Sequence, residues 1–314
     1  MTLWLIGAGT MAIEYARVLK ALGQTFSVIG RGDSSAHFFE KQTGHAVKRY
    51  GLTNALVNLK APDMAIVAVG IEQLSRTTIS LIEAGTKRIL VEKPGGLDIS
   101  EIYSLYRVAA NSNAHVLIGY NRRFYGSVSQ ARKYIEEDGG VLSANFEFTE
   151  WSHLIEPSLV ATEIKKRWVL GNSSHVTDLV FHLIGMPTDW KAWHAGSTPW
   201  HAASARFAGA GVTEKGVMFS YLSDWQAPGR WGVELLTRKR RLIFRPMEEL
   251  QVIHLGRVSV EAVDTLNTLD KEFKPGLFQQ TSAFLTSDDA LFCTLLEQVR
   301  NVKVYSLMAG YPVD

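Results

Sequence analysis

Residues 3–12 read LWLIGAGTMA, four apolar residues followed at once by the dinucleotide-binding pattern G-x-G-x-x-G/A. The apolar residues predict a short buried strand, and the residues after them predict a sharp turn into a helix. Gly7 permits the turn, Gly9 lets a pyrophosphate approach the backbone, and Ala12 lets the helix pack close to the strand. The phosphates would lie at the positive end of that helix. This stretch therefore predicts a Rossmann fold.

Strand and helix patterns alternate as far as residue 121. The run DMAIVAV at residues 63–69 is apolar throughout, which is typical of a parallel strand covered on both faces. The alternation predicts an α/β, doubly wound parallel sheet in a dinucleotide-binding domain of residues 1–121. The expected strands span residues 3–6, 26–29, 63–69, 88–91 and 115–118, and the expected helices span 10–22, 35–43, 74–85 and 99–110.

The pattern changes after residue 121 without a linker or a change of composition. Short alternating segments predict a second, α+β domain over residues 122–314, with a largely antiparallel open sheet. We expect this domain to bind substrate and to mediate oligomerisation. Its expected strands span 142–149, 190–194, 203–207, 216–221, 231–237 and 241–244, and its helical segments span 128–136, 174–184 and 278–307.

Charge and cysteine content exclude several classes of protein. The chain of 314 residues has 33 basic and 31 acidic side chains, so no basic surplus points to nucleic acid as a partner. Its one cysteine, Cys293, excludes an intramolecular disulfide, and its apolar neighbours predict a buried helical residue. No apolar run approaches the roughly 20 residues of a membrane helix, and the N-terminus does not resemble a signal peptide. We therefore expect a cytoplasmic protein without a membrane partner.

The residues after the second strand bear on the choice of cofactor. In NAD-binding Rossmann domains an acidic residue near this position binds the ribose hydroxyls, whereas in NADP-binding domains an arginine accepts the 2′-phosphate. Here Arg31 follows the strand, and Ser34 adds a hydroxyl. The alternative is that Asp33 takes the ribose role and leaves Arg31 in solvent. The sequence favours NADP over NAD.

Further motifs carry a resemblance to a known family. Residues 92–96 (EKPGG) follow a buried strand, residues 119–124 read GYNRRF, residues 175–179 read HVTDL, and residues 275–278 read PGLF. Together with the N-terminal fingerprint, these segments resemble the glucose–fructose oxidoreductase/inositol dehydrogenase family (Gfo/Idh/MocA). The resemblance covers essentially the whole chain. It implies a two-domain oxidoreductase but does not identify a substrate.

Lys93 corresponds to the family lysine that lies beside the nicotinamide, and the resemblance implies a cis peptide bond between Lys93 and Pro94. An ammonium group there would polarise a carbonyl oxygen or stabilise an alkoxide. The alternative is a solvated lysine in an ordinary turn. The residues expected to contact the cofactor are Gly7, Gly9, Thr10, Met11, Arg31, Ser34, Gly70, Glu92, Lys93, Pro94, Asn121 and Arg122.

His175 resembles the family histidine at the end of D-x-G-x-H, a second acid/base group. The sequence departs from that motif, because Gly171 stands in the place of the aspartate and Ser173 in the place of the glycine. The departure interrupts the Lys–Asp–His proton relay that the resemblance implies. Asn172 and Asp178 are the candidates to substitute in part for the missing aspartate, although an asparagine cannot act as a base.

Several basic and aromatic residues bear on the substrate. Arg122, Arg123 and the run at residues 165–167 (KKR) suggest an anionic sugar derivative, although such a run is usually a solvated helix face. Trp168 either stacks on a sugar or belongs to the core. His175, Asp178 and His182 share a helical face, but a structural role is favoured over a metal site. The expected substrate residues are Lys93, Asn121, Arg122, Trp168, Asn172 and His175.

Together these features predict an NAD(P)-dependent oxidoreductase that transfers a hydride at a CH–OH/C=O group of a sugar, polyol or sugar derivative. One alternative is reduction of a non-sugar substrate such as a C=N compound, which the altered motif would permit. Another is an NADP-binding regulatory protein without turnover. The expected helices cover the second sheet only in part, so we also expect a homodimer or homotetramer.

Overall fold

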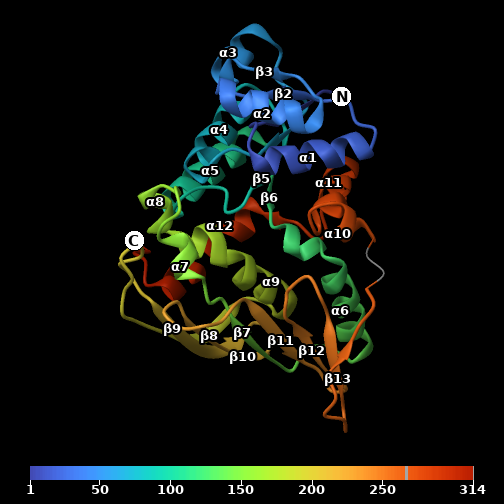
Figure 1. Cartoon of the computed structure of the whole chain (residues 1–314), viewed down its shortest axis with the longest axis vertical. Coiled ribbons are helices and arrows are strands. Elements are labelled where there is room, and N and C mark those ends of the chain that lie inside the picture. The colour runs from blue at the N-terminus through green and yellow to red at the C-terminus, as the bar shows by residue number, and fades with distance from the viewer. Residues whose placement is uncertain (266–267, 314) are drawn as a thin grey trace. The chain divides into compact units, whose positions relative to one another are not determined.

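The computed structural model describes residues 1–265 and 268–313, which divide into two compact units (Figure 1). Unit 1 comprises Met1–Asn121 with Leu269–Arg300, and unit 2 comprises Arg122–Thr268 with Asn301–Asp314. Residues 269–300 thus pack into unit 1, although the sequence pattern assigns them to the second domain. The described helices include none that is both long enough and apolar enough to cross a membrane.

Unit 1 is built on a seven-stranded sheet of order β15-β6-β5-β4-β1-β2-β3. All neighbouring pairs are parallel except the pair of β15 with β6, which confirms the predicted doubly wound sheet. The central strands are buried on both faces, as their unbroken apolar sequences require. The strands are β1 (Leu3–Ile6), β2 (Ser27–Ile29), β3 (Val47–Lys48), β4 (Met64–Val67), β5 (Arg88–Glu92), β6 (His115–Gly119) and β15 (Cys293–Thr294).

Helices connect these strands and cover the sheet. Asp98 caps α5, because its carboxylate accepts a hydrogen bond of 3.0 Å from the backbone N–H of Glu101. Helix α11, from the C-terminal segment, packs against α1 (Figure 1). The short elements β3 and α3 are not predicted from the sequence, because neither has a long apolar repeat. The helices are α1 (Thr10–Ala21), α2 (Asp33–Thr43), α3 (Gly51–Asn58), α4 (Ile71–Glu83), α5 (Ile99–Ser112), α10 (Thr268–Glu272) and α11 (Leu277–Thr286), and α12 (Leu295–Ala309) begins in this unit.

Unit 2 contains an eight-stranded sheet of order β14-β13-β12-β11-β7-β10-β9-β8. Its pairs are antiparallel except that of β7 with β10, which confirms the predicted, largely antiparallel sheet. The strands are β7 (Ser143–Glu147), β8 (Pro187–Ala195), β9 (Arg206–Thr213), β10 (Met218–Asp224), β11 (Gly232–Leu236), β12 (Arg240–Phe244), β13 (Gln251–His254) and β14 (Glu261–Ala262). The helices are α6 (Gly126–Glu137), α7 (Ser152–Ile155), α8 (Thr162–Lys165) and α9 (Ser174–Ile184).

One face of the second sheet forms an aromatic core with α9. Phe146, Phe219 and Tyr221 are buried on that face, and the ring of Phe181 on α9 packs edge-on against both phenylalanines. The alternate residues of β10, such as Ser220 and Leu222, are exposed. Strand β10 therefore alternates between a core face and an outer face.

Two sequence-based assignments of secondary structure are wrong. Residues 203–207 are expected to form a strand, but β9 begins only at Arg206. The helical segment expected over residues 278–307 is interrupted after α11, where Ser287 adopts a left-handed conformation with φ +60°. Cys293 accordingly lies on β15, paired with Ile118 of β6, and is buried in a strand and not in a helix.

Candidate functional site

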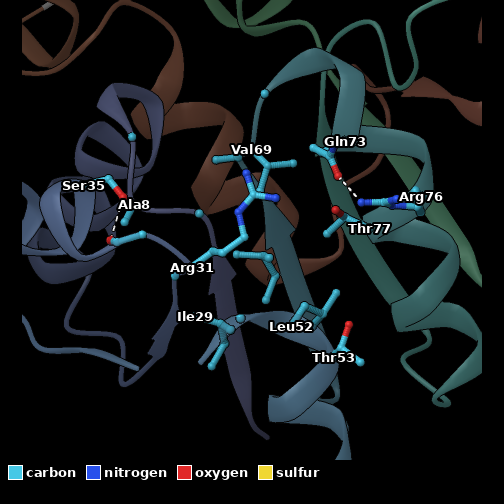
Figure 2. Close-up of a pocket in the computed structure, with 18 of the residues that line it drawn as sticks. Ala8, Ile29, Arg31, Ser35, Leu52, Thr53, Val69, Gln73, Arg76 and Thr77 are labelled. Carbon is cyan, nitrogen blue, oxygen red and sulfur yellow. Dashed lines mark hydrogen bonds between the residues drawn. The ribbon is translucent and has the colours of Figure 1, made fainter. Parts of the chain in front are cut away.

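A pocket of about 760 Å³ lies in unit 1 at the carboxyl ends of β1, β2 and β4. Its size is in the ordinary range for cofactor sites. Six of the residues predicted to bind the cofactor line it, namely Gly7, Gly9, Thr10, Met11, Arg31 and Gly70. Figure 2 shows the other walls, which come from α3 and α4.

The two fingerprint glycines meet different constraints. Gly7 has φ +117°, and a Cβ atom there would lie 2.3 Å from the backbone oxygen of Ala68. Gly9 precedes α1, where no side chain caps the first turn of the helix, and a Cβ atom there would have no neighbour within 4 Å. The uncapped helix end and the open space above Gly9 fit a pyrophosphate group. The pocket therefore fits a dinucleotide, which supplies or accepts a hydride when bound.

The loop after β2 places Arg31 in this pocket. The Arg31 side chain extends across the pocket toward Val69 (Figure 2). Ser34 does not line the pocket, and Ser35 lies there in its place, with its hydroxyl bonded to the Gly32 carbonyl at 3.0 Å. Asp33 also lies outside the lining, and its carboxylate is 3.7 Å from the Arg49 guanidinium.

Other lining residues are absent from the sequence-based prediction. Gln73 and Arg76 come from α4, where the Arg76 guanidinium donates a hydrogen bond of 2.6 Å to the Gln73 side chain (Figure 2). Thr53 and Asn54 come from α3. The spacing of three residues between Gln73 and Arg76 was a signal for one helix face. Helix α3 gave no comparable signal.

Glu92, at the end of β5, is buried and forms a hydrogen bond with α1. Its carboxylate accepts a hydrogen bond of 2.7 Å from the Tyr15 hydroxyl, which also lies 3.2 Å from the side-chain amide of Gln280 on α11. Burial raises the pKa of Glu92 above its usual value, although the Tyr15 hydroxyl and the charges of Lys93 and Lys274 oppose the rise. Burial and the Glu92 carboxylate raise the pKa of Tyr15, which stays protonated as the donor. Glu92 is therefore buried and does not line the nucleotide pocket.

The backbone after Glu92 is held by the C-terminal segment. The Lys93–Pro94 peptide bond is cis, as the family resemblance implies. The Gln298 side-chain amide donates hydrogen bonds to the Pro94 carbonyl at 2.9 Å and to the Tyr120 hydroxyl at 3.1 Å. Asn121 donates to the carbonyl of Pro275 at 2.9 Å. Lys93, Pro94 and Asn121 thus lie outside the nucleotide-pocket lining, at the ends of the neighbouring strands β5 and β6.

In unit 2, His175 lies in the first turn of α9, directly after a π-helical turn at Val169–Ser173. The His175 side chain is largely buried, and its ring lies 6.0 Å from that of Trp231. Asn172, in the π-helical turn, donates a hydrogen bond of 3.0 Å to the Glu150 carboxylate. Asn172 and His175 are therefore close in the chain, and they contact Glu150 and Trp231 respectively.

The two neighbouring arginines of the 3-10 turn at Asn121–Phe124 differ in role. Arg122 lies over the ring of Trp231, 4.8 Å from its centroid, and burial lowers the pKa of its guanidinium. Arg123 forms a two-pronged ion pair with Asp178, with contacts of 2.6 and 2.8 Å, in which both side chains are fully buried. The proposal that Arg123 binds an anion is therefore wrong, and Asp178 holds that guanidinium rather than replacing the motif aspartate.

Other residues from the sequence analysis have structural partners. Trp168 packs edge-on against Trp200, with ring centroids 5.8 Å apart. The Lys165 ammonium is buried and donates to the carbonyls of Glu156 and Ser158, so it is not a solvated face. Burial and nearby cations, including Arg123, lower the pKa of His182 to about 3. Within residues 1–265 and 268–313, no group of histidine, cysteine and acidic side chains is placed to hold a metal ion.

Residues 1–120 match the model of GFO_IDH_MocA, an oxidoreductase family with an NAD-binding Rossmann fold. The Rossmann domain of this chain thus matches that of the Gfo/Idh/MocA oxidoreductases. The match supports an NAD(P)-dependent oxidoreductase, as the motifs predict. A search of curated proteins finds no match to this chain.

Solved structures of dehydrogenases share the whole fold at low sequence identity. Levoglucosan dehydrogenase in complex with NADH has a TM-score of 0.79 at 16% identity, over 98% of this chain and 95% of that one. UDP-N-acetylglucosamine 3-dehydrogenase GnnA from Acidithiobacillus ferrooxidans has a TM-score of 0.75 at 16% identity, over 99% of this chain and 97% of that one. The WlbA dehydrogenase from Chromobacterium violaceum, in complex with NADH and UDP-GlcNAcA, has a TM-score of 0.76 at 15% identity, over 100% of this chain and 96% of that one.

Substitution of the two fingerprint glycines by alanine should separate stability from binding. Gly7→Ala should lower the free energy of unfolding by about 2–5 kcal/mol, because the positive φ and the Ala68 oxygen both oppose a Cβ atom. Gly9→Ala should leave stability within about 1 kcal/mol but weaken dinucleotide binding at least about tenfold. Urea denaturation and NAD(P)H fluorescence titration measure the two effects. Equal stability of both variants would contradict this assignment.

Proposed function

We propose that this oxidoreductase transfers a hydride between NADP and a CH–OH/C=O carbon of a sugar, polyol or sugar derivative. The observation that carries the proposal is the placement of Lys93 at the carboxyl end of β5, on a loop fixed by Gln298 and next to buried Glu92. Ligands bind at this edge of parallel α/β sheets. The dehydrogenases with the same fold support a sugar substrate, since their names include levoglucosan and a UDP-sugar.

Lys93 is the proposed proton donor and electrostatic catalyst. Hydride transfer to a carbonyl carbon leaves negative charge on the oxygen, which an ammonium group stabilises and protonates. In the reverse direction the neutral amine accepts the hydroxyl proton. His175 is the proposed secondary acid/base. Asn121, Arg122, Asn172 and Trp168 are proposed to contact the substrate, with Arg122 favouring an anionic group.

The preference for NADP rests on Arg31. Its planar guanidinium suits a phosphate monoester, and it lines the nucleotide pocket beside Ser35, whereas Asp33 lies outside the lining. A carboxylate that bonds the ribose hydroxyls favours NAD, but Asp33 lies outside the pocket lining.

Removal of the Arg31 side chain should lower affinity for NADPH but not for NADH. Charge-assisted hydrogen bonds contribute about 1.5–3 kcal/mol, so Arg31→Ala should weaken NADPH binding about 10- to 100-fold. Arg107→Ala, at an exposed position of α5 outside the pocket, is the matched control. Isothermal titration with both nucleotides is the measurement. An unchanged NADPH affinity would rule out the NADP assignment.

Loss of the Lys93 ammonium should abolish turnover without loss of cofactor binding. Lys93→Ala should reduce kcat about 10²- to 10⁴-fold, with the dissociation constant for NADPH changed less than about threefold. Lys87→Ala, at the other end of β5, is the control, because the Lys87 ammonium donates to the Ser112 carbonyl. NADPH oxidation should be followed with a panel of keto-sugars and non-sugar carbonyl and imine compounds.

The same panel distinguishes the alternatives. Turnover of imines alone would favour C=N reduction, a reading supported by Gly171 in the place of the motif aspartate. Tight NADPH binding with no turnover of any compound, and no effect of Lys93→Ala, would favour a regulatory protein.

We also propose that two copies of the chain associate through the outer face of the unit 2 sheet. The register aligns Trp193, Ala208 and Leu222 in one row across β8, β9 and β10. Trp193 and Leu222 are more than half exposed, as is Met218 in the same face. A flat row of large apolar and small residues suits a self-complementary dimer interface.

A charge on this outer face should produce monomers. Leu222→Glu should reduce the mass in solution to that of one chain, 34.9 kDa, because a carboxylate would be buried without a partner. Val57→Glu, at an equally exposed position of α3, should leave the mass unchanged. Light scattering coupled to gel filtration measures this. A monomeric wild-type chain at micromolar concentration would contradict the interface.

A further inference from the structure

Glu150 is a buried carboxylate in unit 2 that the sequence analysis does not single out. Its side chain is 2% exposed and has three side-chain partners. One oxygen accepts hydrogen bonds from the Ser173 hydroxyl at 2.7 Å and from the Asn172 amide at 3.0 Å. The other oxygen accepts from the Arg230 guanidinium at 3.1 Å. A buried carboxylate is costly unless it is bonded in this way, so the three partners are held tightly.

Two of these partners belong to the π-helical turn Val169–Ser173. Such turns are rare, and they occur frequently at functional sites. Helix α9 starts at the next residue, Ser174, and His175 lies in its first turn. The Glu150 bonds to Asn172 and Ser173 therefore fix the backbone from which the His175 ring projects.

The third partner leads to His175 by another route. The Arg230 guanidinium lies 4.8 Å from the ring centroid of Trp151 and 4.4 Å from that of Trp231. The Trp231 ring in turn packs against His175. Glu150 thus orients Arg230, and the stacked arginine and indole form one side of the His175 environment.

We propose that Glu150 is a positioning residue for the reaction, which holds Asn172 and His175 in their working orientation from outside their own helix. The inference rests on the proposed function in that His175 is taken to act on substrate. A carboxylate on a separate segment of the chain then holds the histidine in place. Glu150 itself need not touch the substrate.

The charge of Glu150 should also make the rate fall at low pH, so that the pH–rate profile has an acidic limb. Burial raises the pKa of Glu150, while the Ser173 hydroxyl, Arg230 and Asn172 oppose the rise. Arg122 is a further cation in this region, and its guanidinium interacts electrostatically with both Glu150 and Arg230. Protonation of Glu150 as the pH falls weakens its bond to Arg230 and leaves the Arg230 charge uncompensated over the Trp231 ring, which packs against His175. As the pH is lowered, the rate should therefore begin to fall at a higher pH than it would if the titrating group were an exposed glutamate.

The test is Glu150→Gln, which keeps the shape and an acceptor oxygen but removes the charge. It should lower kcat about tenfold, a change of about 1.4 kcal/mol in the barrier, without a change in NADPH affinity, and should remove the acidic limb of the pH profile. Glu147→Gln is the matched control. Its carboxylate, on β7, is bonded to Arg245 at 2.9 Å, three residues from Glu150. Wild-type kcat and an unchanged profile in Glu150→Gln would overturn the proposal.

A double-mutant cycle with His175→Ala tests the route of the effect. If Glu150 acts through His175, Glu150→Gln should have no further effect on kcat in the His175→Ala background. Multiplicative effects, or a silent His175→Ala in an enzyme that still depends on Lys93, would overturn the inference and leave the proposed hydride transfer intact.

An NMR measurement makes the inference independent of turnover. Glu150→Gln should shift the ring resonances of His175 in the protein without substrate, whereas Glu147→Gln should not. Absence of that shift in a folded variant would overturn the positioning role. Absence of turnover on every compound, with the shift present, would instead contradict the proposed function alone.

Discussion

The hydrogen bond from Tyr15 to Glu92 joins the helix that begins at the nucleotide pocket to the strand that precedes Lys93. Tyr15 belongs to the helix whose first turn faces the phosphate position, and Glu92 directly precedes Lys93. Because both groups are buried, neither can exchange its partner for water without a large loss of free energy. A shift of α1 relative to β5 would break this bond, so the phosphate end and the lysine end of unit 1 keep a fixed spacing.

The C-terminal segment completes this constraint. Gln280 on α11 approaches the Tyr15 hydroxyl, Gln298 bonds to the Pro94 carbonyl, and β15 extends the sheet beside β6. The loop that carries Lys93 therefore depends on residues about 200 positions later in the chain. Such contacts carry a loop-closure cost that grows only slowly with separation, so a remote segment can stabilise a local loop efficiently.

The sequence predicts most of unit 1 because its determinants are local. The Gly7 turn, the apolar strands and the position of Arg31 after β2 each follow from a few neighbouring residues. The packing of residues 269–300 into unit 1 could not be predicted from local sequence, because a two-residue strand such as β15 has no periodic signal. Arg123 looked like an anion ligand for a related reason, since its buried partner Asp178 lies 55 residues away.

Glu150 illustrates why the second unit is harder to predict. A motif search looks for a carboxylate at a fixed offset from His175, and finds Gly171 there. In the folded chain a carboxylate reaches the same turn from beyond β7, bonded to Asn172 and Ser173. Replacing a buried carboxylate and its partners by apolar side chains is often neutral or stabilising, so stability alone gives little reason to keep Glu150. Its bonds at the start of α9 fit the proposed role of holding one histidine in one orientation.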